Sequence, residues 1–166
     1  MAIQVPSQLS HLLSLISEIP DPEVPVITIA ELGILRDIKE ENGKIIVTIT
    51  PTYSGCPAMK AIENEIADIL RANSVSEFEI KYTFSPAWTT DWLNDSAKEK
   101  LRVYGIAPPE KSSSDKTVLF MQQKTKSCPR CSSTDTEMIS AFGSTACKAL
   151  YRCKNCGEPF DYFKCH

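Results

Sequence analysis

The stretch CPRCSSTDTEMISAFGSTACKALYRCKNCG, residues 128–157, decides the fold of the C-terminal part of the chain. It contains two Cys-x-x-Cys pairs separated by 21 residues. The two sulfurs of such a pair can wrap one ion while backbone amides point at the thiolates, and two pairs make a closed tetrahedral site. The predicted metal ligands are therefore Cys128, Cys131, Cys153 and Cys156.

The four-thiolate set favours structural zinc, although the same ligands can hold iron or an iron–sulfur cluster, and free or redox-active thiols remain the alternative to a metal. Gly157 suits the left-handed turn that often closes a knuckle. For the additional thiols Cys147 and Cys165, packing in a small core is as reasonable as a metal or redox role. A tail of about 50 residues is hard to stabilise by burial alone, so a metal would contribute much of its folding free energy.

The rest of the chain predicts an α+β protein, with a small α/β domain at residues 1–106 and a zinc-ribbon-like β domain at residues 117–166. The segment 107–116, APPEKSSSDK, has the composition of a linker. Beyond it, short strands are expected at 117–121, 137–142, 150–152 and 160–164.

In the first domain, helices are expected to pack on a sheet of three to four strands. Apolar residues at helical spacing predict a helix over 7–19, and a second helix is expected to begin at Pro57. Asn42-Gly43 lies between two strand-like runs and predicts a hairpin. Alternation over 78–84 predicts a third strand, and a further helix is expected over 91–104.

The net charge of −3 is divided unevenly: residues 1–116 hold 11 basic and 17 acidic residues, whereas 117–166 hold 7 and 4. The positive residues are scattered rather than clustered, which disfavours a nucleic-acid partner. No apolar run approaches the roughly 20 residues that span a bilayer. Seven cysteines, an odd number, without a secretory signal pattern favour a cytoplasmic protein.

No nucleotide-binding or hydrolase motif is present, and the two histidines, His11 and His166, lie near the chain ends. Acid–base or nucleophilic catalysis by histidine is therefore poorly supported.

A third group of candidate site residues comprises Cys56, Asp21 and Glu23. Cys56 is predicted at the N-cap of the second helix, where the helix dipole would lower the pKa of its thiol and favour metal or sulfide chemistry. A simple capping turn is the alternative. Asp21 and Glu23 lie in a proline-rich loop, where they could contact a metal or a partner or could be solvated charges.

Two sets of motifs resemble known families. DPEVPVITIAELGILRDI (21–38) and TPTYSGCPAMKAI (50–62) resemble the iron–sulfur cluster assembly factors, which include SufT-type proteins. With PAWTTDW (86–92), KLRVYGIAPP (100–109) and the cysteine-rich end (142–166), the chain resembles the PaaD family of accessory subunits of the bacterial phenylacetyl-CoA epoxidase system.

The resemblance implies a non-catalytic factor that helps this iron-containing monooxygenase to acquire its metal centre, with the oxygenase and reductase subunits as partners. It also implies transient handling of iron or an iron–sulfur cluster. Cys56 matches the family's characteristic cysteine, and Asp21 and Glu23 lie in its Asp-Pro-Glu motif. A structural or electron-transfer subunit of the complex and a zinc-ribbon nucleic-acid module are the remaining alternatives.

Overall fold

The computed structural model describes residues 7–110 and 126–164, and the chain divides into two compact units between Trp88 and Thr89. Each unit has its own sheet, one of three strands and one of four. In the described part of the chain, none of the helices has the length and apolar character needed to cross a membrane.

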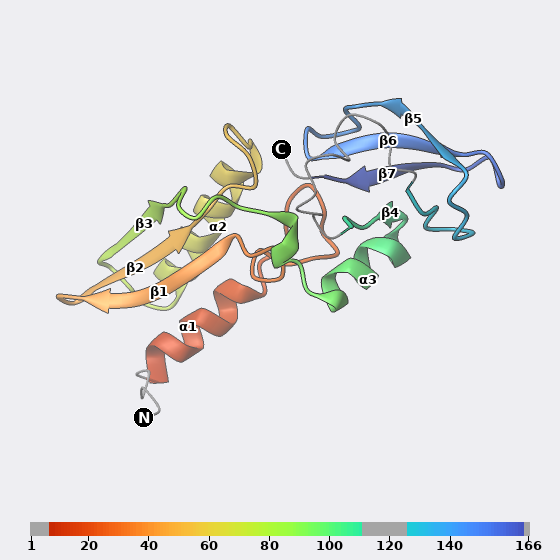
Figure 1. Cartoon of the computed structure of the whole chain (residues 1–166). Coiled ribbons are helices and arrows are strands. Elements are labelled where there is room, and N and C mark those ends of the chain that lie inside the picture. The colour runs from red at the N-terminus through yellow and green to blue at the C-terminus, as the bar shows by residue number, and fades with distance from the viewer. Residues whose placement is uncertain (1–6, 111–125, 165–166) are drawn as a thin grey trace. The chain divides into compact units, whose positions relative to one another are not determined.

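The first unit is a three-stranded sheet with two helices on one face (Figure 1). Its elements are α1 (Ser7–Ser17), β1 (Leu35–Glu41), β2 (Lys44–Ile49), α2 (Ala58–Ala72) and β3 (Phe78–Tyr82). The strand order is β1-β2-β3. β1 and β2 are antiparallel, and β2 and β3 are parallel with α2 as the crossover.

The predicted hairpin is present, because β1 and β2 pair directly on either side of Asn42-Gly43. Both turn residues have positive φ, 54° for Asn42 and 78° for Gly43. This is the backbone of a type I′ turn, whose twist matches that of paired strands. The predicted strand over 78–84 also forms, as β3.

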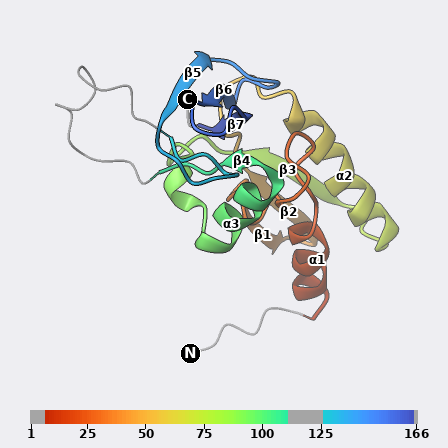
Figure 2. The same ribbon diagram turned by 90° about the vertical axis from the view of Figure 1, so that its right-hand side faces the viewer.

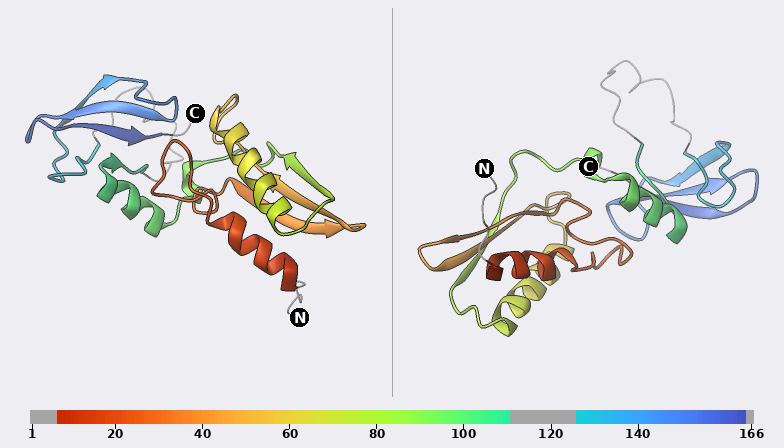
Figure 3. Two further views of the ribbon diagram at one scale, coloured as in Figure 1. Left: turned by 180° about the vertical axis from the view of Figure 1, so that it is seen from behind. Right: turned by 90° about the horizontal axis from the view of Figure 1, so that it is seen from below.

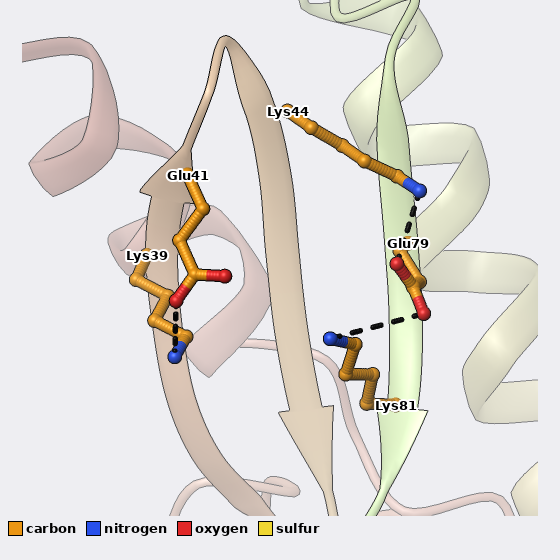
Figure 4. Close-up of polar contacts among 5 residues, drawn as sticks. All are labelled: Lys39, Glu41, Lys44, Glu79 and Lys81. Atoms are coloured by element: carbon orange, nitrogen blue, oxygen red, sulfur yellow. Dashed lines mark hydrogen bonds and ion pairs between the residues drawn. The ribbon is translucent and has the colours of Figure 1, made fainter.

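The core of this unit lies between the helices and one face of the sheet, and Figure 3 (left) shows α2 in front of the strands. Leu12 and Ile16 of α1 and Ile62, Ile66 and Leu70 of α2 are completely buried. The opposite face of the sheet is polar: Figure 4 shows its charged side chains, with the helices behind the strands. They are Lys39, Glu41, Lys44, Glu79 and Lys81.

The second unit contains a four-stranded sheet of order β4-β7-β6-β5, which can be followed in Figures 1 and 2. Its elements are a 3₁₀ turn (Thr90–Trp92), α3 (Asp95–Tyr104), β4 (Ile106–Ala107), β5 (Thr136–Ser140), β6 (Lys148–Cys153) and β7 (Pro159–Phe163). β5, β6 and β7 form an antiparallel meander, whereas β4 pairs with β7 in parallel.

The helix expected over 91–104 is divided in two. Asn94 has extended backbone and caps α3, because its Oδ1 accepts the N–H of Ala97 at 2.7 Å. α3 ends at Gly105, whose φ of 96° requires the left-handed region that glycine adopts without strain.

The division of the chain differs from the boundary that composition predicts. Ile106 and Ala107 pair with Asp161 and Tyr162 of β7, so α3 and β4 belong to the second unit. Of the predicted linker 107–116, only the first residues are described, and the strand expected over 117–121 lies outside the described residues.

Candidate functional site

The four predicted metal ligands come together at one end of the second sheet. The sulfurs of Cys128, Cys131, Cys153 and Cys156 all lie within 4.8 Å of one another. Cys128 Sγ is 3.8 Å from Cys156 Sγ, and Cys131 Sγ is 3.6 Å from Cys153 Sγ. A tetrahedral ion with metal–sulfur bonds of about 2.3 Å requires sulfur–sulfur edges of about 3.8 Å. The two shortest contacts match such edges, so the cluster is compatible with one four-coordinate ion.

The two Cys-x-x-Cys turns have the same backbone construction. In the first, Cys128 N–H donates to the carbonyl of Ser133, and Ser132 N–H donates to the carbonyl of Cys128, each at 2.9 Å. The second turn repeats both bonds at the same length, with Gly157 in the place of Ser132. Ser132 and Gly157 have φ of 61° and 77°, so each knuckle ends with a residue in the left-handed backbone conformation.

Each turn contributes one buried and one exposed sulfur. Cys128 and Cys153 are 1% and 0% exposed and form a small core with Ala107 and Phe160. Cys131 and Cys156 are exposed. The apolar core thus holds the first cysteine of each pair in place, while an ion bound there would lie at the surface of the unit.

The electrostatics of the cluster favour a bound cation. The backbone N–H of Ser133, aided by Asn155 Nδ2 at 3.7 Å, lowers the pKa of the Cys131 thiol to about 6. A hydrogen bond from the Glu158 backbone lowers the pKa of the Cys156 thiol, but some loss of hydration and the neighbouring sulfurs outweigh it and raise that pKa to about 12. Four sulfurs this close cannot all be thiolates unless a cation balances their charge.

Charged side chains join the two knuckles. Arg130 Nη1 of the first turn is 2.5 Å from Glu158 Oε2 beside the second. Next to the cluster, the buried Lys126 reaches Glu110 Oε2 at 3.3 Å and lies 4.3 Å from the centre of the Tyr162 ring. These contacts cross-connect segments that are far apart in the sequence.

The other predicted thiols do not join this cluster. Cys147 is buried next to the opposite end of β6 from Cys153, and its sulfur lies 3.0 Å from Thr145 Oγ1. Cys165 lies outside the described residues. Among the described residues, the four clustered cysteines are the one group of three or more metal-binding side chains that lie this close together.

Cys56 occupies a half-buried position in the loop between β2 and α2 of the first unit. α2 begins at Ala58 with Pro57 as its N-cap, so Cys56 is not the N-cap, as predicted, but lies one residue before it. The predicted lowering of its pKa is wrong. Burial raises the pKa of the Cys56 thiol, and this outweighs the hydrogen bond with the Ala58 backbone that lowers it.

Asp21 and Glu23 lie close enough to Cys56 for their carboxylates to raise the pKa of its thiol further, Glu23 more than Asp21. Asp21 is buried, and its Oδ1 accepts the backbone N–H groups of Glu23 and Val24 at 2.9 and 2.8 Å. Asp21 therefore holds the proline-rich loop in shape, and Glu23 adds negative charge near the thiol. Cys56, Asp21 and Glu23, here called the Cys56 loop site, therefore interact through charge, but they are not grouped as closely as the four ribbon cysteines.

The sequence interpretation missed four residues of the ribbon: Ser132, Ser133, Asn155 and Arg130. The first two are recognisable only by aligning the knuckles on each other, because Ser132 occupies the position that Gly157 marks in the second turn. No local signal predicts that Asn155 donates to a sulfur of the other knuckle.

Comparison with known proteins matches both units. A family model described as "Iron-sulfur cluster assembly protein" covers residues 10–77, and one described as "PaaD zinc beta ribbon domain" covers residues 112–164. The solved structure of "Domain of Unknown Function DUF59" from Bacillus anthracis is similar with a TM-score of 0.51 and 28% identity, over 57% of this chain and 92% of that one. The fold and cluster thus define a protein that joins an iron–sulfur-assembly-type α+β domain to a zinc-ribbon domain.

Relatives define the family. The chain is 45% identical, over 99% of its own length and 98% of the relative's, to a protein of Escherichia coli (strain K12) that is named as a component of the "Putative 1,2-phenylacetyl-CoA epoxidase". It is 30% identical to the "Fe-S protein maturation auxiliary factor YitW" of Bacillus subtilis (strain 168), over 56% of this chain and 92% of that protein. The chain belongs to the PaaD family.

Proposed function

We propose that this chain is a non-catalytic accessory factor that assists assembly of the iron or iron–sulfur centre of a phenylacetyl-CoA epoxidase system. The name of the Escherichia coli relative, a component of such an epoxidase, supports the choice of client system. The name of the Bacillus subtilis relative, a maturation factor, supports the type of role. The oxygenase and reductase subunits of the epoxidase are the proposed partners, and the cytoplasm, where thiols stay reduced, is the proposed location.

The observation that carries this proposal is that the carboxylates of Glu23 and Asp21 act through their charge on the thiol in the Cys56 loop site. A soft sulfur and hard carboxylate oxygens are both ligands of iron in proteins. Burial, with these negative charges as a smaller cause, keeps the thiol protonated at rest. The charges also attract a metal cation, and the arriving cation displaces the proton. Such a site suits iron as cargo, held briefly and then released to a client with more ligands.

The ribbon has a different proposed role. Its four cysteines would hold one zinc ion, which supplies a fixed tetrahedral cross-link between the two knuckles. The donor set and sulfur spacing support this assignment, as does the description of the family model as a zinc ribbon. On this account the zinc stabilises the ribbon, and the ribbon contacts the client.

The test is replacement of Cys56 by serine, which keeps the size of the side chain and removes the soft ligand. We expect Cys56→Ser to fold normally, to keep its zinc and to lower the iron content and activity of the co-expressed epoxidase. Unchanged iron content and activity of the client would rule out the transfer role.

A matched control moves the thiol within the same loop. Ser54 is exposed and lies two residues before Cys56. Adding Ser54→Cys to Cys56→Ser leaves the number of thiols unchanged but displaces the sulfur. This double variant should be as defective as Cys56→Ser, whereas rescue by a displaced thiol would show that its position is unimportant.

A second candidate function follows from the chemistry of the four-sulfur cluster. Its donor set also accepts iron, and an iron-loaded ribbon would be redox-active, as in an electron-transfer subunit. A visible absorption band that bleaches reversibly on reduction would favour this alternative, because zinc has no such band.

A further inference from the structure

We infer that two copies of this chain associate through the β3 edges of their first units, forming one continuous six-stranded sheet. The partner is a second copy because β3, Phe78-Glu79-Ile80-Lys81-Tyr82, is complementary to itself when it is paired antiparallel. This inference concerns assembly and does not depend on the proposed function.

In the part of the chain that the structure describes, the outer edge of β3 pairs with no other strand. Within the described residues β3 pairs with β2 alone, as the last strand of its sheet. The carbonyl of Glu77 accepts Ile45 N–H and the N–H of Thr83 donates to Ile49, so odd-numbered residues of β3 face β2. By the alternation of a strand, the backbone groups of Phe78, Ile80 and Tyr82 point outward. An exposed edge of this kind is a template for another strand.

One register satisfies both the backbone and the side chains. With Ile80 opposite its own copy, Phe78 faces Tyr82 of the second copy, and the outward groups form about six hydrogen bonds. In the same register, Glu79 of each copy lies opposite Lys81 of the other copy, which gives two such pairs by symmetry. Sliding by two residues in either direction would instead set Glu79 against Glu79 or Lys81 against Lys81, which is repulsive. The charges therefore select the symmetric register.

The two faces of this edge also suit a copy of the same chain. On the helix-covered face, Phe78 and Ile80 line an open groove of about 390 Å³ beside Lys60, Glu63 and Arg71 of α2, and the Tyr82 side chain is 41% exposed. In a continuous sheet the second copy would place its Phe78, Ile80 and Tyr82 next to this groove. Glu79 and Lys81 project from the opposite, polar face (Figure 4), where a partner's charges can reach them.

The test is the molar mass of the full chain in solution, measured by light scattering and sedimentation over a range of concentrations. The wild-type chain should have twice the mass of the monomer at micromolar concentrations. Lys81→Glu alone, or Glu79→Lys alone, should weaken dimerisation by at least about tenfold, because each creates like-charge pairs across the two-fold axis. The double reversal Glu79→Lys with Lys81→Glu should restore the dimer to within about threefold.

Lys39→Glu is the matched control, since Lys39 lies on β1 at the other edge of the same sheet and is about as exposed as Lys81. It should leave dimerisation unchanged, and circular dichroism should confirm that every variant is folded. A monomeric wild-type chain would overturn the inference. The inference would fail equally if the chain alone is a monomer and an added client protein covers its β3 edge. A dimer whose affinity is unchanged by Lys81→Glu and by Glu79→Lys would overturn it as well.

Discussion

The sulfurs of Cys131 and Cys153 lie 3.6 Å apart although 22 positions separate these residues in the chain. The short sulfur–sulfur contacts thus run between the two Cys-x-x-Cys turns, as Cys128 and Cys156 also show. Because the two turns are built alike and their sulfurs converge, an ion bound between them would cross-link the segment that precedes β5 to the turn between β6 and β7.

Removing one ligand is expected to unfold the ribbon. Cys131→Ser should lower the zinc content from about one ion per chain to nearly none, since a structural site needs all four ligands. Hydrogen exchange should show loss of protection in β5, β6 and β7 while β1–β3 stay protected. Cys147→Ser is the control, because Cys147 is buried outside the cluster; retained protection in the Cys131→Ser ribbon would contradict the structural role of the metal.

We expect the main role of Asp21 to be stabilising the conformation of its loop, with any contact to a metal secondary. Asp21→Ala leaves the buried N–H groups of Glu23 and Val24 without their acceptor, so the free energy of unfolding should fall by about 1–3 kcal/mol. Asp21→Asn keeps an acceptor oxygen and should cost less. Equal denaturation midpoints for Asp21→Ala and the wild-type chain would show that these hydrogen bonds contribute little.

The Cys56 thiol is expected to react slowly at neutral pH. Burial raises its pKa above that of an ordinary thiol, so less of it is thiolate at pH 7–8, and its alkylation rate should rise only at higher pH. Glu23→Gln removes one repulsive charge and should increase the rate in part, since burial is the larger cause. The rate can be followed by mass spectrometry of the Cys56 peptide. Alkylation as fast as that of a free cysteine at pH 7.5 would contradict the buried setting.

The Arg130–Glu158 ion pair is expected to be dispensable for metal binding. Both side chains are largely exposed, and such pairs contribute little in water. Arg130→Ala should keep its metal and its thermal midpoint. Loss of zinc from this variant would mean that the pair organises the knuckles before the ion binds.

Much of the local structure could be predicted from the sequence. Asn42-Gly43 predicts the hairpin because few residues adopt positive φ at both positions, and the spacing of the cysteines predicts the cluster because each knuckle is a local turn. The pairing of β4 with β7 was not predictable, because Ile106 and Ala107 carry no strand pattern and their partners lie more than fifty positions away.

The pKa of the Cys56 thiol likewise depends on contacts that are distant in the sequence and could not be predicted from it. Its position before a helix is visible in the sequence, and this suggests a lowered pKa through the helix dipole. The opposite shift arises from burial and from two carboxylates more than thirty positions earlier. Tertiary packing therefore reverses a prediction that only considers the neighbouring helix.

The convergence of the four cysteine sulfurs on one ion is tested most directly by elemental analysis of the anaerobically purified full chain. Zinc, iron and acid-labile sulfide should be counted per chain, with Cys147→Ser and Cys156→Ser measured in parallel. The account predicts about one zinc per chain in the wild type and in Cys147→Ser, almost none in Cys156→Ser, and no labile sulfide. A metal-free wild-type protein, or one zinc retained by Cys156→Ser, would contradict it.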